Sequence, residues 1–194
     1  MIIGLTGSMG CGKGEVVKIL ENEGFKYVTL SMMVREEARK RGIPEEREKL
    51  MEVGNSMRKD GGAGVLAKRA LETILASDSS KWVIDGIRNP AEIDELKKSE
   101  GVYIVGIKTD LDLLVDRIIS RNRESDAKIP AGGAGMTEAE YILRKVKREW
   151  GEGEPEDGQQ VGKCMEKVDV LIDNNGTLED LNRKFTEYYS EIAK

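Results

Sequence analysis

A glycine-rich segment near the N-terminus limits the possible folds of this chain more than any other stretch. Residues 7–14 read Gly-Ser-Met-Gly-Cys-Gly-Lys-Gly and lie between the apolar run Ile2–Thr6 and a helical pattern that begins at Lys13. A buried strand, a glycine-rich turn and a helix in this order direct several backbone N–H groups and the positive end of a helix at one point, which suits phosphate oxygens. The segment predicts a loop that binds nucleotide phosphates, formed by Gly7, Ser8, Met9, Gly10, Cys11, Gly12, Lys13, Gly14 and Glu15.

The residues after the lysine bear on metal binding. Many loops of this kind continue with Ser or Thr, whose hydroxyl binds Mg²⁺, whereas Gly14 and Glu15 follow Lys13 in this sequence. Gly14 has no side chain that could bind a metal. Glu15 either holds Mg²⁺ through water or is an exposed carboxylate that the dipole of the following helix stabilises, and the sequence leaves both interpretations open.

Strand and helix patterns alternate along the rest of the chain. The predicted strands are continuous apolar runs, as expected for a parallel sheet covered on both faces. They span Ile2–Thr6, Lys26–Leu30, Trp82–Asp85, Val102–Lys108 and Asp169–Ile172. Complete helices are predicted over Lys13–Glu23, Met33–Arg41 and Val65–Ala76, and further helices start after the capping residues Asn89, Thr137 and Thr177. This alternation predicts one α/β domain over residues 1–194.

Composition narrows the kinds of partner. The net charge of −5 argues against nucleic acid as the main partner, and local arginine clusters suit small phosphorylated ligands. No apolar run approaches the roughly 18 residues that cross a bilayer, and the N-terminus has no export signal. The chain has two cysteines and no histidine, which suits a reducing compartment. We expect a cytoplasmic protein that binds small-molecule nucleotides and no membrane; the choice between monomer and homo-oligomer stays open.

Three segments resemble nucleoside monophosphate kinases of the adenylate kinase type. The ending Gly12-Lys13-Gly14 is similar to their phosphate loop, which also lacks Ser or Thr directly after the lysine. Ser31 and Arg35 follow the second predicted strand, where these kinases have a Ser or Thr and then an arginine that holds the acceptor phosphate. Residues 85–88, Asp-Gly-Ile-Arg, resemble the family's Asp-Gly-x-Pro-Arg, shortened by one residue.

Over nearly its whole length the chain resembles the archaeal adenylate-kinase-related family, through residues 34–42, 85–88 and 173–177. The last of these segments is also similar to dephospho-CoA kinases, in which the corresponding loop packs against the adenine base. The resemblance implies the three-layer α/β/α sandwich of P-loop NTPases, with a five-stranded parallel sheet of order 2-3-1-4-5. It also implies an acceptor-binding helical region at about 31–76 and a helical lid at about 117–150.

The resemblance further implies a role for each candidate residue, with ATP as co-substrate and Mg²⁺ as cofactor. The expected catalytic residues are Lys13, Asp85, Arg88, Arg121 and Arg148. The expected acceptor-binding residues are Ser31, Arg35 and Arg88, the expected adenine-binding residues are Arg117, Asn174, Asn175 and Gly176, and Glu15 and Asp85 are expected to hold Mg²⁺ through water. The polar segment Arg123–Gly135 between two arginine-bearing helices is expected to belong to the lid. Such a site needs no histidine, because phosphoryl transfer depends on positioning and charge neutralisation.

The leading functional interpretation is an ATP-dependent phosphotransferase, a nucleotide kinase that moves the γ-phosphate to a nucleoside monophosphate or a similar small phosphorylated acceptor. One alternative is a dephospho-CoA kinase, in which the acceptor is a ribose hydroxyl. An alternative of another class is a non-catalytic ATP- or AMP-binding regulatory protein, in which Gly14 and Glu15 have weakened catalysis. A GTPase is disfavoured, because no guanine-reading Asn-Lys-x-Asp segment follows a later strand.

Overall fold

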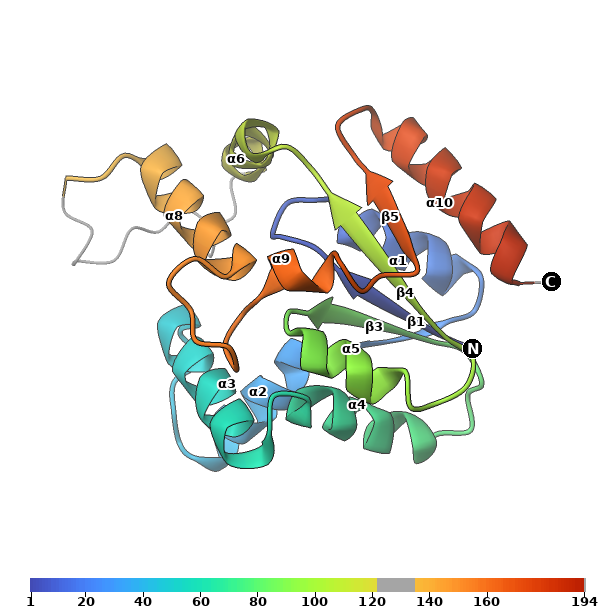
Figure 1. The fold of residues 1–194 in the computed structure, drawn as a ribbon, viewed down its shortest axis with the longest axis horizontal. Helices are drawn as coiled ribbons and strands as arrows, with labels where there is room; N and C mark the ends of the chain where they lie inside the picture. Colours follow the sequence, from blue (N-terminus) through green and yellow to red (C-terminus); the bar gives the residue numbers. More distant parts are fainter. Residues whose placement is uncertain (122–134, 194) are drawn as a thin grey trace.

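A parallel sheet forms the centre of the fold. The computed structural model describes residues 1–121 and 135–193, and within them five parallel strands run in the order β2-β3-β1-β4-β5 (Figure 1). The strands are β1 (Ile2–Thr6), β2 (Lys26–Thr29), β3 (Trp82–Ile87), β4 (Val102–Lys108) and β5 (Val170–Asp173). The predicted α/β class and strand order are confirmed.

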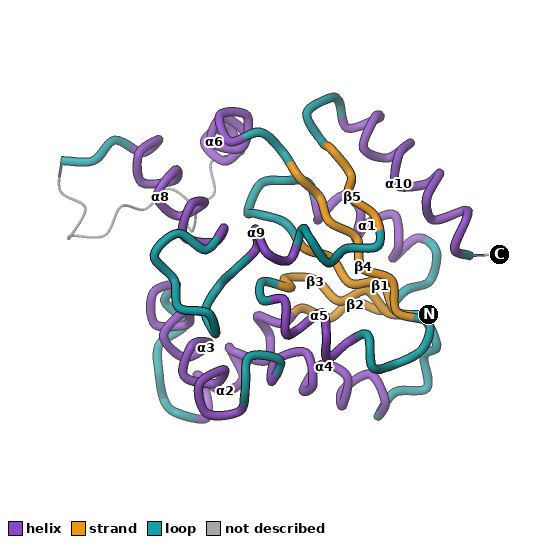
Figure 2. The backbone as a smooth tube through the Cα atoms, viewed as in Figure 1, coloured by secondary structure: helices purple, strands orange, loops and turns teal. Residues whose placement is uncertain are grey.

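Helices cover both faces of this sheet (Figure 2). They are α1 (Lys13–Asn22), α2 (Leu30–Lys40), α3 (Arg47–Gly61), α4 (Val65–Leu75), α5 (Pro90–Leu96), α6 (Leu111–Ser120), α8 (Glu138–Trp150), α9 (Val161–Cys164) and α10 (Leu178–Ile192). Val16 of α1 and Phe185 of α10 belong to one buried apolar layer, and Leu66 of α4 belongs to the other. Consecutive residues Ile104 and Val105 of β4 face opposite layers, as the period of a strand requires.

The three helix starts that the sequence predicts from capping residues are confirmed. Asn89, Thr137 and Thr177 each form a capping box, in which the cap side chain accepts from the helix and an acidic side chain accepts from the cap N–H. Gly24 and Gly42 follow α1 and α2 with φ of 84° and 66°, the left-handed conformation in which glycine ends helices.

The third strand is longer than the sequence predicts. It continues two residues past Asp85 because Gly86, with φ of 83°, forms an irregularity in the pairing with β1. Leu5 pairs with Asp85 and Thr6 pairs with Ile87, so the extra residue is absorbed at Gly86. The Thr6 hydroxyl then donates to the Ile87 carbonyl at 2.9 Å.

Other boundaries differ for local reasons. The second helix starts at Leu30 rather than Met33, because Thr29 acts as the N-cap and accepts from the Ser31 N–H; β2 therefore ends one residue early. The last strand begins one residue later than predicted, since Asp169 is occupied by hydrogen bonds to both backbone groups of Ile104. The predicted C-termini of α1, α2 and α4 are each one residue too long.

Among the described residues, two helices are not predicted by the sequence pattern. The helix α3 contains Gly54, Asn55 and Ser56 in its middle, and these residues are weak helix formers. The helix α9 has only four residues, too few for a periodic pattern to be recognised. Both helices matter for the site, because Arg58 of α3 and Gln160, the residue before α9, bind the segment that follows β3.

We expect Gly86→Ala to lower the free energy of unfolding by about 1–3 kcal/mol, measured by urea denaturation. An alanine would have to adopt the left-handed φ, and its Cβ would lie 3.1 Å from the Thr29 hydroxyl oxygen. Gly14→Ala is the matched control, because no atom lies within 4 Å of the added Cβ and the backbone is helical. Equal stability of the two variants would show that the irregularity at Gly86 stores no strain.

Candidate phosphate-binding site

The glycine-rich segment forms a tight loop between β1 and α1. Gly7, Gly10 and Gly12 have φ of 147°, 83° and 109°, values that side chains disfavour. A Cβ on Gly7 would lie 2.5 Å from the Ile107 carbonyl oxygen, and one on Gly12 would lie 2.5 Å from the Asn174 side-chain nitrogen. Both the backbone conformation and the close packing therefore require glycine at these positions. The loop leads from the carboxyl end of β1 into the N-terminus of α1.

Lys13 folds back over this loop. Its ammonium group donates to the carbonyl oxygens of Gly7 at 2.6 Å and Ser8 at 3.0 Å, and it lies 3.7 Å from the Cys11 sulfur. These contacts place one positive charge at the centre of the loop, where the carbonyl groups hold it until an anion competes for it.

Cys11 is buried within the loop. Burial raises the pKa of its thiol, the Lys13 charge opposes that rise, and the charges of Asp85 and Glu149 raise the pKa further. The thiol therefore stays protonated and packs as a small apolar side chain. Glu149 contacts the loop through the Met9 N–H, and Asp85 pairs with Leu5, two residues before the loop.

Asp85 lies two residues before the carboxyl end of β3 and pairs with Leu5 of β1. Its carboxylate accepts from the Gly86 N–H at 2.6 Å, and the side chain is half-buried. The irregularity at Gly86 changes the direction of the chain immediately after the carboxylate, which brings Arg88 to the same edge of the sheet. Parallel sheets bind ligands at this edge.

Arg88 has its peptide groups fixed from both sides. Its N–H donates to a Glu92 carboxylate oxygen at 2.8 Å, and its carbonyl oxygen accepts from the Gln160 N–H at 2.6 Å. Its guanidinium is one-third exposed and lies 3.5 Å from the Glu149 carboxylate. The backbone is thus held while the charged end stays accessible, although the family's proline is missing.

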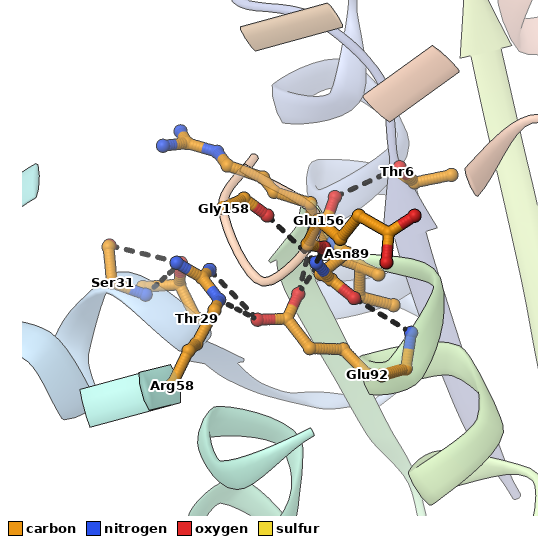
Figure 3. Close-up of polar contacts among 11 residues, drawn as sticks. Thr6, Thr29, Ser31, Arg58, Asn89, Glu92, Glu156 and Gly158 are labelled. Atoms are coloured by element: carbon orange, nitrogen blue, oxygen red, sulfur yellow. Dashed lines mark hydrogen bonds and ion pairs between the residues drawn. The ribbon is translucent and has the colours of Figure 1, made fainter. Parts of the chain in front are cut away.

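A buried polar network supports this segment (Figure 3). Arg58 of α3 donates twice to one oxygen of Glu92, at 3.1 and 2.9 Å, and the two side chains are 5% and 0% exposed. The other oxygen of Glu92 accepts from the N–H groups of Arg88 and Asn89. The Asn89 amide donates to the carbonyl oxygens of residues 156 and 158. Sequence reasoning identified Asn89 of this network as a helix cap and did not find Arg58 or its pairing with Glu92.

Glu149, in the last turn of α8, is a second residue that sequence reasoning missed. Its carboxylate accepts from the Met9 N–H in the loop at 2.8 Å and lies 3.5 Å from the Arg88 guanidinium. The side chain is only 4% exposed. A sequence signal exists, because Glu149 continues the buried stripe of Ile142 and Val146 at the spacing of one helix face.

The four residues expected to bind adenine lie together. The Arg117 guanidinium donates to the carbonyl oxygens of Asn174 at 2.8 Å and Gly176 at 3.0 Å. The Asn174 side chain is buried and donates to the Cys11 carbonyl oxygen at 2.8 Å, so it ties the loop after β5 to the phosphate loop. Asn175 is exposed, and its side-chain oxygen accepts from the residue that precedes α6.

Two of the three residues expected to bind the acceptor follow β2, at the opposite end of the strand order from β5. Ser31 is in the first turn of α2, with its hydroxyl 3.1 Å from that of Thr29. Arg35 lies one turn later, and its guanidinium donates to the Glu45 carboxylate at 2.6 Å. Glu45 also accepts from Arg39, and these two hydrogen bonds lower the pKa of its carboxyl.

The arginines of the predicted lid differ in their surroundings. Arg121 is exposed directly after α6. Arg148 forms an ion pair with Glu154. The next residue, Glu149, is the one that contacts the loop. Most of the predicted lid segment 123–135 lies outside the described residues.

Two wider properties hold within the described ranges. There, no three or more Asp, Glu, Cys or His side chains gather closely enough to bind a metal ion by themselves. In the same part of the chain, no helix combines the length and the apolar character needed to cross a membrane.

A strand, a glycine-rich loop and a helix at the carboxyl edge of a 2-3-1-4-5 sheet define a P-loop nucleotide-binding domain with a kinase-like fold. The model of the AAA domain family matches residues 3–143. UPF0200 protein PH1008 of Pyrococcus horikoshii is 34% identical over 197 residues, which cover 99% of this chain and 97% of the relative. The chain therefore belongs to the AAA domain family and to the UPF0200 family.

Solved structures share the fold. TT1252 from Thermus thermophilus superposes with a TM-score of 0.61 at 18% identity, covering 98% of this chain and 97% of that chain. Shikimate kinase from Acinetobacter baumannii superposes with a TM-score of 0.54 at 15% identity, covering 99% and 92%. At such identities the likeness concerns the fold alone, which is that of P-loop small-molecule kinases.

Proposed function

We propose that this chain is an ATP-dependent phosphotransferase that moves the γ-phosphate to a nucleoside monophosphate or a similar small phosphorylated acceptor. The observation that carries the proposal is that one carboxylate, that of Glu149, reaches both the Met9 N–H of the phosphate loop and the Arg88 guanidinium. A single anionic group therefore spans the gap between the loop and the guanidinium, so a γ-phosphate bound at the loop would also reach Arg88, the residue proposed to hold the acceptor phosphate. Transfer requires this proximity.

The proposed reaction needs no covalent intermediate on the protein. A phosphate oxygen of the acceptor attacks the γ-phosphorus, the bond from the γ-phosphorus to the β,γ-bridging oxygen breaks, and ADP leaves with that oxygen. Lys13 and the loop N–H groups would neutralise the charge on the leaving β-phosphate, and Arg88 would hold the acceptor phosphate. Arg121 and Arg148 of the proposed lid, 117–150, would add positive charge on closure.

The position of the Asp85 carboxylate suits a role in holding Mg²⁺, whereas the position of Glu15 suits that role less well. The Asp85 carboxylate is half-buried at the strand end, close enough to the loop to raise the pKa of the Cys11 thiol, and a single carboxylate commonly holds Mg²⁺ that keeps most of its waters. The Glu15 carboxylate pairs with Lys18 at 2.9 Å. When bound with ATP, Mg²⁺ would neutralise phosphate charge.

The adenine of ATP and the acceptor would lie on opposite sides of the phosphate loop. Arg117 and the 174–176 segment are proposed to form the adenine side, because they are fixed to the loop through Asn174 and Cys11. The helical region 31–76, with Ser31 and Arg35, is proposed to form the acceptor side. Occupancy by an acceptor phosphate would require Arg35 to exchange its Glu45 partner.

The proposal is tested with the purified chain, Mg-ATP and a panel of acceptors, following ADP release. The panel contains the ribo- and deoxynucleoside monophosphates, dephospho-CoA and shikimate, the last because shikimate kinases share this fold. We expect turnover that depends on a nucleoside monophosphate and disappears when Mg²⁺ is removed with EDTA.

The other outcomes separate the alternatives. Turnover with dephospho-CoA or shikimate alone would move the assignment to a kinase whose acceptor is a hydroxyl group. Tight AMP binding without turnover on any acceptor would contradict the kinase proposal and favour a regulatory nucleotide-binding protein.

A further inference from the structure

Glu149 places a carboxylate where a phosphate-binding protein would bind its anionic ligand. It lies on the buried face of α8 with Ile142 and Val146, and only 4% of its side chain is exposed. Removing a carboxylate from water is costly unless charged or N–H partners compensate. Its compensating partners include the Met9 N–H at 2.8 Å and Arg88 at 3.5 Å, which both belong to the candidate site.

Those two partners are groups that a terminal phosphate would use. Met9 lies four residues before Lys13, at the end of the loop next to β1, so its N–H is distant from the first turn of α1 that serves the inner phosphates. Arg88 lies at the carboxyl end of the neighbouring strand β3. The Glu149 carboxylate accepts from one N–H and pairs with one guanidinium here, so it resembles a phosphate in both charge and hydrogen-bonding capacity.

We propose that Glu149 is an internal competitor for the terminal phosphate, so that nucleotide binding displaces its carboxylate and shifts the last turn of α8. The proposal rests on the phosphate binding of the proposed function but not on catalysis. Displacement follows from electrostatics and from counting donors, because one N–H cannot fully serve two acceptors and two anions repel strongly in a poorly hydrated site. Phosphate occupancy is thereby coupled to α8, a part of the proposed lid.

The surroundings of the last turn allow it to move. Next to it lies a cavity of about 250 Å³, lined among others by Ser8, Leu114, Val146 and Trp150. Gly151, with φ of 121°, directly follows α8, so the chain can change direction there without a side-chain penalty. Trp150 is 41% exposed and neighbours Glu149, which makes its fluorescence a direct reporter of the displacement.

The test measures the dissociation constant of Mg-ATP by isothermal titration calorimetry for the wild type, Glu149→Gln and Glu152→Gln. Glutamine keeps the shape of Glu149 and removes its charge, so we expect the dissociation constant to fall roughly tenfold as the competing state is lost. Glu152→Gln removes the same charge three residues further along the chain. The Glu152 side chain is 68% exposed, so we expect the dissociation constant to change by less than about twofold. Urea denaturation checks that both variants fold.

Fluorescence adds a second readout. Mg-ATP is expected to change the tryptophan emission of the wild type at saturation, and Trp150→Phe is expected to remove that change because Trp82 is buried in β3. An unchanged or weaker affinity of Glu149→Gln for Mg-ATP would overturn the proposal and assign Glu149 to holding Arg88 in place. Tighter binding without turnover on any acceptor would support the competitor while contradicting the kinase, so the two proposals fail separately.

Discussion

Lys13→Met is expected to lower acceptor-dependent ADP release more than about 100-fold while the fold stays intact. The ammonium group lies over the loop, bound to the Gly7 and Ser8 carbonyl oxygens, and transfer would develop negative charge at the same place. Its two hydrogen bonds contribute on the order of 1–3 kcal/mol to stability, a fraction of what a domain of this size has. Steady-state kinetics and urea denaturation of the same preparation measure both effects.

Lys18→Met is the matched control for this variant. Lys18 lies on the same helix, is 67% exposed and pairs with Glu15 at 2.9 Å, a kind of ion pair that contributes less than about 1 kcal/mol. The two variants remove the same charge from the same helix, so net charge cannot explain a difference between them. Near-wild-type turnover of Lys13→Met would place the phosphate-binding site elsewhere.

The parts of the fold that the sequence predicts are those specified by neighbouring residues. The phosphate loop depends on Gly7, Gly10 and Gly12, which lie within six positions and each combine a positive φ with a close contact that excludes other residues. The capping boxes at Asn89, Thr137 and Thr177 are local in the same sense. The strand order came from the family resemblance, and the pairing confirms it.

The support of the site could not be predicted in the same way, because its partners are distant in sequence. Glu149 meets Met9 across 140 positions, and Arg58 meets Glu92 across 34. Nothing local distinguishes Arg58 from the exposed Lys59 beside it. The pattern of α8 did contain a signal, an acid on the apolar face, but charge chemistry directed attention to Arg148, whose partner is Glu154.

Arg58→Met is expected to lower the free energy of unfolding by about 3–5 kcal/mol, because it leaves the fully buried Glu92 carboxylate without its cation. Urea denaturation measures this loss. In the double variant Arg58→Met, Glu92→Gln the buried charge is also gone, and a glutamine oxygen can still accept from the Arg88 or Asn89 N–H. The double variant is therefore expected to be more stable than Arg58→Met alone.

Lys167→Met provides the control, because Lys167 pairs with Asp94 of the same helix α5 at 2.6 Å but on the surface. Its loss is expected to cost less than about 1 kcal/mol. If Arg58→Met were as mild as this control, the Glu92 carboxylate would have to find water or another cation. The network would then not be what holds the Arg88 peptide, and the position of Arg88 would depend on the Gln160 N–H instead. Turnover of the two variants distinguishes these cases, since only loss of the network displaces the Arg88 guanidinium from its position beside Glu149.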